Sequence, residues 1–175
     1  MKALVVYESL YGNTAAIGEA IAESLRTHGL EVDAHPVTKV AAAETAGWDL
    51  LVVGGPTHAH GMSRAATRKS GAGDQKNTFA EPTVEPGLRD WLGSLPAGAG
   101  RYAAAFDTRF DQSALLTGSA ARGIARRLEH HGFHLVVGPE SFFVTGQNRL
   151  AEGQTEHAEV WGTTLAEHVR QTITR

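Results

Sequence analysis

The stretch "ALVVYESLYGNT", residues 3–14, decides the fold. Its first half is an apolar run without alternation, which is typical of a strand covered on both faces, and its second half is a polar turn. Directly after the turn, Ile17, Ile21 and Leu25 recur at four-residue spacing, and Gly29 follows as a natural helix end. We therefore predict a strand over residues 3–7 and a helix over residues 14–28, joined by the turn.

The same alternation of strand and helix continues along the chain. Further apolar runs predict strands at residues 31–35, 50–54, 102–106 and 134–137, with a possible extension through 141–144. Helical spacing predicts helices over residues 87–95, 114–131 and 155–170. This order indicates an α/β fold with a doubly wound, five-stranded parallel sheet and helices on both faces. A chain of 175 residues is the usual size for one domain, so we expect a single domain over residues 1–175.

Composition restricts the function. The net charge of -3 comes from 19 acidic and 16 basic side chains spread along the chain. This composition lacks the excess of basic residues that is typical of proteins that bind nucleic acid or an anionic membrane. The chain has no cysteine, so any redox chemistry must come from a bound cofactor. No apolar run approaches the ~18 residues of a membrane span, and we expect a soluble, cytoplasmic protein.

The polar turn at residues 8–14 is a candidate anion site. A helix that starts after a central strand presents unpaired N–H groups and the positive end of its dipole. Ser9 and Thr14 can add hydroxyl donors, Asn13 an amide, and Gly12 allows close approach of the backbone. The turn fits neither the dinucleotide fingerprint nor the P-loop pattern. The alternative is that Ser9, Asn13 and Thr14 only cap the helix.

Two further turns follow the third and fourth predicted strands: "GGPTHAHGMSR", residues 54–64, and "FDTRFDQS", residues 106–113. In doubly wound sheets, ligands bind beyond the carboxyl ends of the strands at the switch point. Together the three turns resemble those of the flavodoxin family, in which the first loop has the form [ST]-x-[TY]-G-N-T; here it reads "SLYGNT", residues 9–14. The resemblance implies bound FMN and the sheet order 2-1-3-4-5.

The resemblance also implies which residues contact FMN. The first turn would hold the phosphate, and the other two would flank the isoalloxazine ring. The implied cofactor-binding residues are Ser9, Leu10, Tyr11, Gly12, Asn13, Thr14, Pro56, Thr57, His58, Ala59, His60, Gly61, Met62, Asp107, Thr108, Arg109, Phe110, Asp111 and Ser113. We assign no catalytic residue and no metal ligand.

The sequence departs from the family in two ways. Flavodoxins often stack Trp or Tyr on the flavin, but neither occurs in the two ring-side turns, where Phe110 is the candidate platform. Flavodoxins are also usually strongly acidic, whereas here Arg64, Arg68 and Lys69 follow the second turn. Cations near the ring would stabilise reduced flavin. Alternatively, they are solvated charges of a polar loop over residues 67–85.

The leading hypothesis is an FMN-binding protein that transfers electrons to a redox partner protein or a small-molecule acceptor. One alternative is an FMN-dependent NAD(P)H:quinone-type oxidoreductase with residues 67–85 as a lid. Another is a flavin-free interaction module on the same fold. A phospho-receiver is disfavoured, because Gly54, Gly55 and Pro56 stand where it needs an aspartate. We predict no nucleic-acid partner and no membrane span, and the sequence leaves the oligomeric state open.

Overall fold

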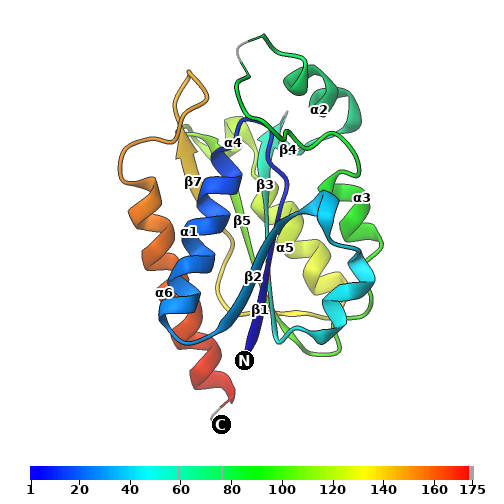
Figure 1. The fold of residues 1–175 in the computed structure, drawn as a ribbon, viewed down its shortest axis with the longest axis vertical. Helices are drawn as coiled ribbons and strands as arrows, with labels where there is room; N and C mark the ends of the chain where they lie inside the picture. Colours follow the sequence, from blue (N-terminus) through cyan, green and yellow to red (C-terminus); the bar gives the residue numbers. More distant parts are fainter. Residues whose placement is uncertain (59, 76, 174–175) are drawn as a thin grey trace.

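A central sheet organises the computed structural model, which describes residues 1–58, 60–75 and 77–173 (Figure 1). Within these residues the sheet has seven strands. Those on its main path run parallel and are, in spatial order, β2 (Glu31–Pro36), β1 (Lys2–Tyr7), β3 (Leu50–His58), β5 (Tyr102–Phe110) and β6 (His134–Leu135). The remaining two are β7 (Glu140–Val144), which also pairs with β5, and β4 (Gly61–Met62), which forms a hairpin with the end of β3.

The last position of the sheet is shared by β6 and β7. Both pair in parallel with β5, β6 at its start and β7 at its end. The residues between them include Gly138 and Pro139, and proline has no N–H to donate to the ladder. When β6 and β7 are counted as one interrupted strand, the order is the predicted 2-1-3-4-5. The predicted doubly wound α/β fold is confirmed.

Helices cover both faces of the sheet. α1 (Asn13–Thr27) and α6 (Gln154–Ile173) lie together on one face, and α3 (Leu88–Gly93) and α5 (Ala120–His130) lie on the other (Figure 1). In β1, Val5 packs with α1 and α6, whereas Leu4 and Val6 pack with α3 and α5. This alternation explains why the strand is apolar without interruption. No helix in the described ranges is long and apolar enough to cross a membrane.

The predicted helix over residues 114–131 is two helices, α4 (Ala114–Thr117) and α5. The break falls at Gly118, which has φ +71° and lies against the backbone of His60. A Cβ at this glycine would stand 2.1 Å from the carbonyl oxygen of His60. The chain therefore turns here to pair with residue 60, and Leu116, within the predicted helix, is exposed.

The predicted loop over residues 67–85 is wrong for its first part. Residues Ala65–Ala72 form the helix α2, which lies above the carboxyl ends of the strands (Figure 1). Its start is fixed by Thr67, whose Oγ1 accepts from the N–H of Arg64 and donates to the Arg64 carbonyl, both at 2.9 Å.

Two short 3-10 helices, η1 (Val37–Lys39) and η2 (Ala42–Gly47), connect β2 to β3.

Candidate functional site

A pocket lies where the three predicted turns meet, beyond the carboxyl ends of β1, β3 and β5. Its volume is about 50 Å³. It is lined by Val144 and by nine of the predicted residues: Leu10, Tyr11, Asn13, Thr14, Pro56, Thr57, Thr108, Arg109 and Phe110. The structure therefore brings together residues of all three turns, which are far apart in the sequence.

The first turn leaves a row of backbone donors unused. Gly12 is the N-cap of α1 and has φ +88°, a conformation that favours glycine. In the described part of the chain, the N–H groups of residues 10–14 donate no hydrogen bond to a protein acceptor. These groups stand at the positive end of the α1 dipole, so the turn is suited to hold an anion.

The side chains of the turn have different partners. The Ser9 hydroxyl accepts from the N–H of Ala15 at 3.3 Å, and this is a capping contact. The Thr14 hydroxyl is buried and hydrogen-bonded to that of Thr108 at 2.7 Å. The Asn13 amide donates to the carbonyl of Asn148 at 2.8 Å. The capping interpretation therefore describes Ser9, but not Asn13 or Thr14.

Residues 77–83, which we call the strap, lie along the first turn. The Asn77 amide donates to the carbonyl of Leu10 at 2.9 Å. Ser9 and Thr83 are joined twice: the Thr83 N–H donates to the Ser9 carbonyl at 2.7 Å, and the Ser9 N–H donates to the Thr83 hydroxyl at 3.2 Å. The Phe79 ring covers Gly12, where a Cβ would stand 2.9 Å from it. These contacts were not predicted, because a polar segment without a helical or strand pattern carries no signal of what it packs against.

The second turn continues the sheet before it bends. Thr57 and His58 extend β3 and pair with Met62 and Gly61 of β4, and Met62 is buried. His60 is exposed, with φ +74°. The remaining predicted residue of this turn, Ala59, lies outside the described residues. Burial lowers the pKa of His58, and the charge of Arg68 lowers it further, so we expect a neutral imidazole at pH 7.

In the third turn, Asp107 has a structural role. Its side chain is fully buried, and Oδ2 accepts from the Thr57 hydroxyl at 3.0 Å, the Ser119 hydroxyl at 2.8 Å and the Ala121 N–H at 2.9 Å. Asp107 thus joins the second turn to the start of α5. It does not line the pocket, although it was predicted to be a cofactor-binding residue.

The outer part of the third turn is more open. Phe110 lines the pocket and is 45% exposed. Arg109 donates to Ser141 Oγ at 3.1 Å and lies over the Phe143 ring, with its guanidinium carbon 5.0 Å from the ring centre. Asp111 and Ser113 are exposed and outside the pocket lining, and the Ser113 hydroxyl caps α4.

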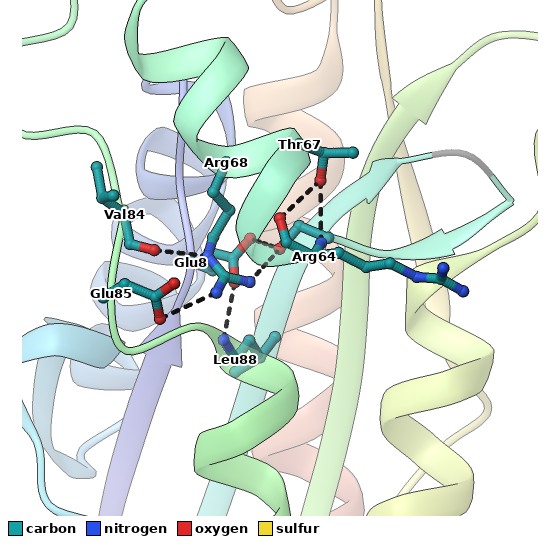
Figure 2. Close-up of polar contacts among 8 residues, drawn as sticks. Glu8, Arg64, Thr67, Arg68, Val84, Glu85 and Leu88 are labelled. Atoms are coloured by element: carbon teal, nitrogen blue, oxygen red, sulfur yellow. Dashed lines mark hydrogen bonds and ion pairs between the residues drawn. The ribbon is translucent and has the colours of Figure 1, made fainter.

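A buried polar network joins the first turn to α2 and to the start of α3 (Figure 2). Glu8 and Arg68 are both 1% exposed and meet through the hydroxyl of Ser63. The Ser63 hydroxyl donates to Glu8 Oε1, Arg68 Nη1 donates to Ser63 Oγ at 3.3 Å, and the N–H of Leu88 donates to Glu8 Oε2 at 2.8 Å. Burial raises the pKa of Glu8, while Ser63, Leu88 and Arg68 counteract that rise.

Arg68 therefore is neither a solvated loop charge nor a free cation beside a cofactor. Its Nε donates to the Val84 carbonyl at 2.7 Å, and its Nη2 pairs with the Glu85 carboxylate at 3.1 Å. Figure 2 shows the Arg64 side chain pointing away from this network. Arg64 and Lys69 are exposed, so only these two of the three predicted cations remain available to solvent.

Comparison with known proteins agrees with this geometry. Residues 5–85 match the family model described as flavodoxin. The whole fold is similar to a flavodoxin from the domain Archaea, with 20% identity and a TM-score of 0.68 over 97% of this chain and 99% of that one. It is also similar to oxidised flavodoxin 1 from Bacillus cereus, with 16% identity and a TM-score of 0.70 over 96% of this chain and 99% of that one.

A third similar structure is larger. Rubredoxin oxygen:oxidoreductase from Desulfovibrio gigas matches with 17% identity and a TM-score of 0.64 over 99% of this chain, but only 37% of that one. No curated protein sequence matches the chain. At these identities the solved structures establish a flavodoxin-like fold, and the family match of residues 5–85 agrees with the resemblance of the first two turns.

Proposed function

We propose that this chain, flavodoxin-like in the sequence of residues 5–85 and in its fold throughout, binds FMN beyond the carboxyl ends of β1, β3 and β5 and transfers electrons. The observation that carries the proposal is the row of unused N–H donors at residues 10–14. A phosphate dianion on these donors would satisfy groups that the described protein leaves without a partner. A flavin-free interaction module on the same fold would leave these donors to water.

The residues of the site fit the phosphate and the ring of FMN at two separate places. The pocket of about 50 Å³ has room for a phosphate-sized group but not for a three-ring flavin. The phosphate would therefore lie on residues 10–14 with the Thr14 hydroxyl, and the ring at the outer rim between the second and third turns, where Phe110 is exposed. Bound FMN supplies the redox chemistry, because the side chains of a cysteine-free chain have none of their own.

The protein's own contribution is to hold the flavin and to keep water from its phosphate. The strap covers the first turn, with Phe79 over Gly12, and its hydrogen bonds to Ser9 and Leu10 fix it there. Asp107 fixes the second turn to the start of α5. Such pre-formed loops lower the ordering cost of binding. A cytoplasmic location is part of the same proposal.

Titration of the flavin-free protein tests this function. We expect FMN to bind at least about ten-fold more tightly than riboflavin, because only FMN carries a phosphate for the N–H groups of residues 10–14. The measurement is quenching of flavin fluorescence, followed by the visible spectrum of the complex. Equal affinities for the two flavins would contradict the proposed phosphate site, and failure to bind either would favour the flavin-free module.

Phe110 tests where the ring lies. In Phe110→Ala we expect FMN and riboflavin to lose equal affinity, roughly 1–3 kcal/mol each by analogy with base–aromatic stacking, because both share the ring. Leu115→Ala is the matched control, since Leu115 is an exposed apolar residue outside the pocket. If Phe110→Ala binds both flavins as tightly as the wild type does, the ring does not stack on this residue.

A further inference from the structure

A second, larger hollow lies beside the proposed flavin site. This groove, of about 840 Å³, runs between α3 and α5. Its end nearest the carboxyl ends of the strands is formed by His60, Met62, Gly118 and Ser119. Along its length it is lined by Arg89, Arg122, Arg126, Arg127, His130 and His131. Among the described residues that line it, none is acidic and none is Phe, Tyr or Trp.

The arginines of the groove, Arg89, Arg122, Arg126 and Arg127, have no direct carboxylate partner among the described residues. Arg89 is held in place by the Met62 carbonyl, to which its Nη2 donates at 3.0 Å. Burial lowers the pKa of Arg89, and the charges of Arg127 and Arg64 lower it further, although Asp90 and Glu8 partly offset them. Because the whole chain has a net charge of -3, this concentration of cations is local.

Exposed apolar side chains adjoin the same end of the groove. Ala114 lines the groove and begins α4, in which Leu115 is 90% exposed and Leu116 is 66% exposed. Phe110, at the proposed flavin rim, is also exposed. Exposed apolar patches rimmed by polar residues mark interaction sites, and arginine is enriched in protein interfaces.

We propose that the surface formed by α4 and the Arg-lined side of α5 docks a redox protein with an acidic surface. The proposal rests on the proposed function, since the surface adjoins the second and third turns that would flank the flavin. Carboxylates of the partner would meet Arg122, Arg126 and Arg127, and its apolar centre would cover Leu115 and Leu116. One electron then passes between the partner and the flavin, so that one protein is oxidised by one electron as the other is reduced.

The surface favours a protein over a small phosphorylated ligand for two reasons. Among the described lining residues, the groove offers no aromatic ring on which a nucleotide base would stack. The leucines of α4 lie outside the groove lining, where a ligand confined to the groove would leave them exposed. Complementary charge between proteins mainly raises the rate of association and makes it depend on salt.

The test uses an acidic [2Fe–2S] ferredoxin as the probe. Reduced ferredoxin is mixed with the FMN-loaded protein in a stopped-flow instrument, and the second-order rate constant of flavin reduction is measured. At about 10 mM salt we expect Arg122→Gln/Arg126→Gln to be roughly ten-fold slower or more, and at about 0.5 M salt to equal the wild type. Lys2→Gln/Arg26→Gln is the matched control, because it removes two positive charges at the far end of the sheet and should slow the reaction less than two-fold.

Apolar contact has a different signature. Leu115→Ser/Leu116→Ser should slow the reaction at both salt concentrations, since salt does not screen apolar burial. Equal rates in the two charge variants at low salt would overturn the proposal, because net charge alone would then explain the effect. The proposal would also be overturned if NADPH binds and Arg122→Gln/Arg126→Gln abolishes that binding without changing the ferredoxin rate.

Direct binding separates this proposal from the proposed function. Affinity of ferredoxin for the flavin-free protein is measured by calorimetry for the same variants, and this readout needs no FMN. If Arg122→Gln/Arg126→Gln loses ferredoxin binding and the control charge variant keeps it, the docking surface is supported even if FMN does not bind. Unchanged ferredoxin affinity in a protein that binds FMN normally overturns the docking surface and leaves the flavin site intact.

Discussion

Arg68→Met is expected to lower the free energy of unfolding by about 3–5 kcal/mol, the usual cost of removing one partner from a buried charged network. Methionine fills part of the space but leaves the carbonyl of Val84 and the Ser63–Glu8 pair without their donor. Unfolding in urea measures the loss. Lys69→Met is the matched control, because Lys69 is the next residue of α2 and is exposed, and it should change stability by less than about 0.5 kcal/mol.

The origin of this loss can be resolved with a second substitution. Glu8→Gln keeps an oxygen that accepts from the Leu88 N–H but removes the charge that Arg68 faces. If the two residues act through Ser63 as one network, Glu8→Gln/Arg68→Met should lose less stability than the sum of the single variants. Additive losses would show that Arg68 acts independently of Glu8, through Val84 and Glu85. A loss in Arg68→Met no larger than that in Lys69→Met would contradict the network altogether.

The burial of Arg68 could not be predicted from the sequence. In "ATRKS", residues 66–70, nothing distinguishes Arg68 from its exposed neighbours, because the pattern carries no apolar stripe. Its burial depends on Gly87, nineteen residues later, where a Cβ would stand 2.1 Å from the Arg68 guanidinium. A close approach between distant residues of this kind is set by tertiary packing and leaves no local signal.

The strands and the first turn were predictable for the opposite reason. A strand that is buried on both faces needs apolar residues without alternation, so an uninterrupted apolar run such as residues 50–54 predicts a buried strand. In the structure these residues are buried in β3. The unused N–H donors of the polar turn after β1 were also predictable, because the first N–H groups of any helix have no intrahelical partner. By contrast, the family resemblance implied that Asp107 contacts the cofactor, and no local pattern indicated that its side chain instead meets Thr57 and Ser119 in the folded chain.

Thr14→Val is expected to weaken FMN binding by about ten- to a hundred-fold, because a hydrogen bond to a charged group contributes roughly 1.5–3 kcal/mol. Valine has nearly the shape of threonine and leaves the N–H groups of residues 10–14 in place. Riboflavin affinity should barely change, since riboflavin has no phosphate to accept from this hydroxyl. The measurement is the ratio of the FMN and riboflavin dissociation constants in the wild type and the variant.

The structure supplies a control that separates phosphate binding from internal hydrogen bonding. The Thr14 hydroxyl is bonded to that of Thr108, so Thr108→Val removes the same internal contact but leaves the Thr14 hydroxyl in the turn. If Thr14 donates to the phosphate, Thr108→Val should keep the preference for FMN within about three-fold of the wild type, while Thr14→Val loses it. Ser9→Ala is less informative, because the Ser9 hydroxyl also caps Ala15 and its loss should lower thermal stability. Equal losses of FMN and riboflavin in Thr14→Val would mean that the turn shapes the pocket without holding the phosphate through this hydroxyl.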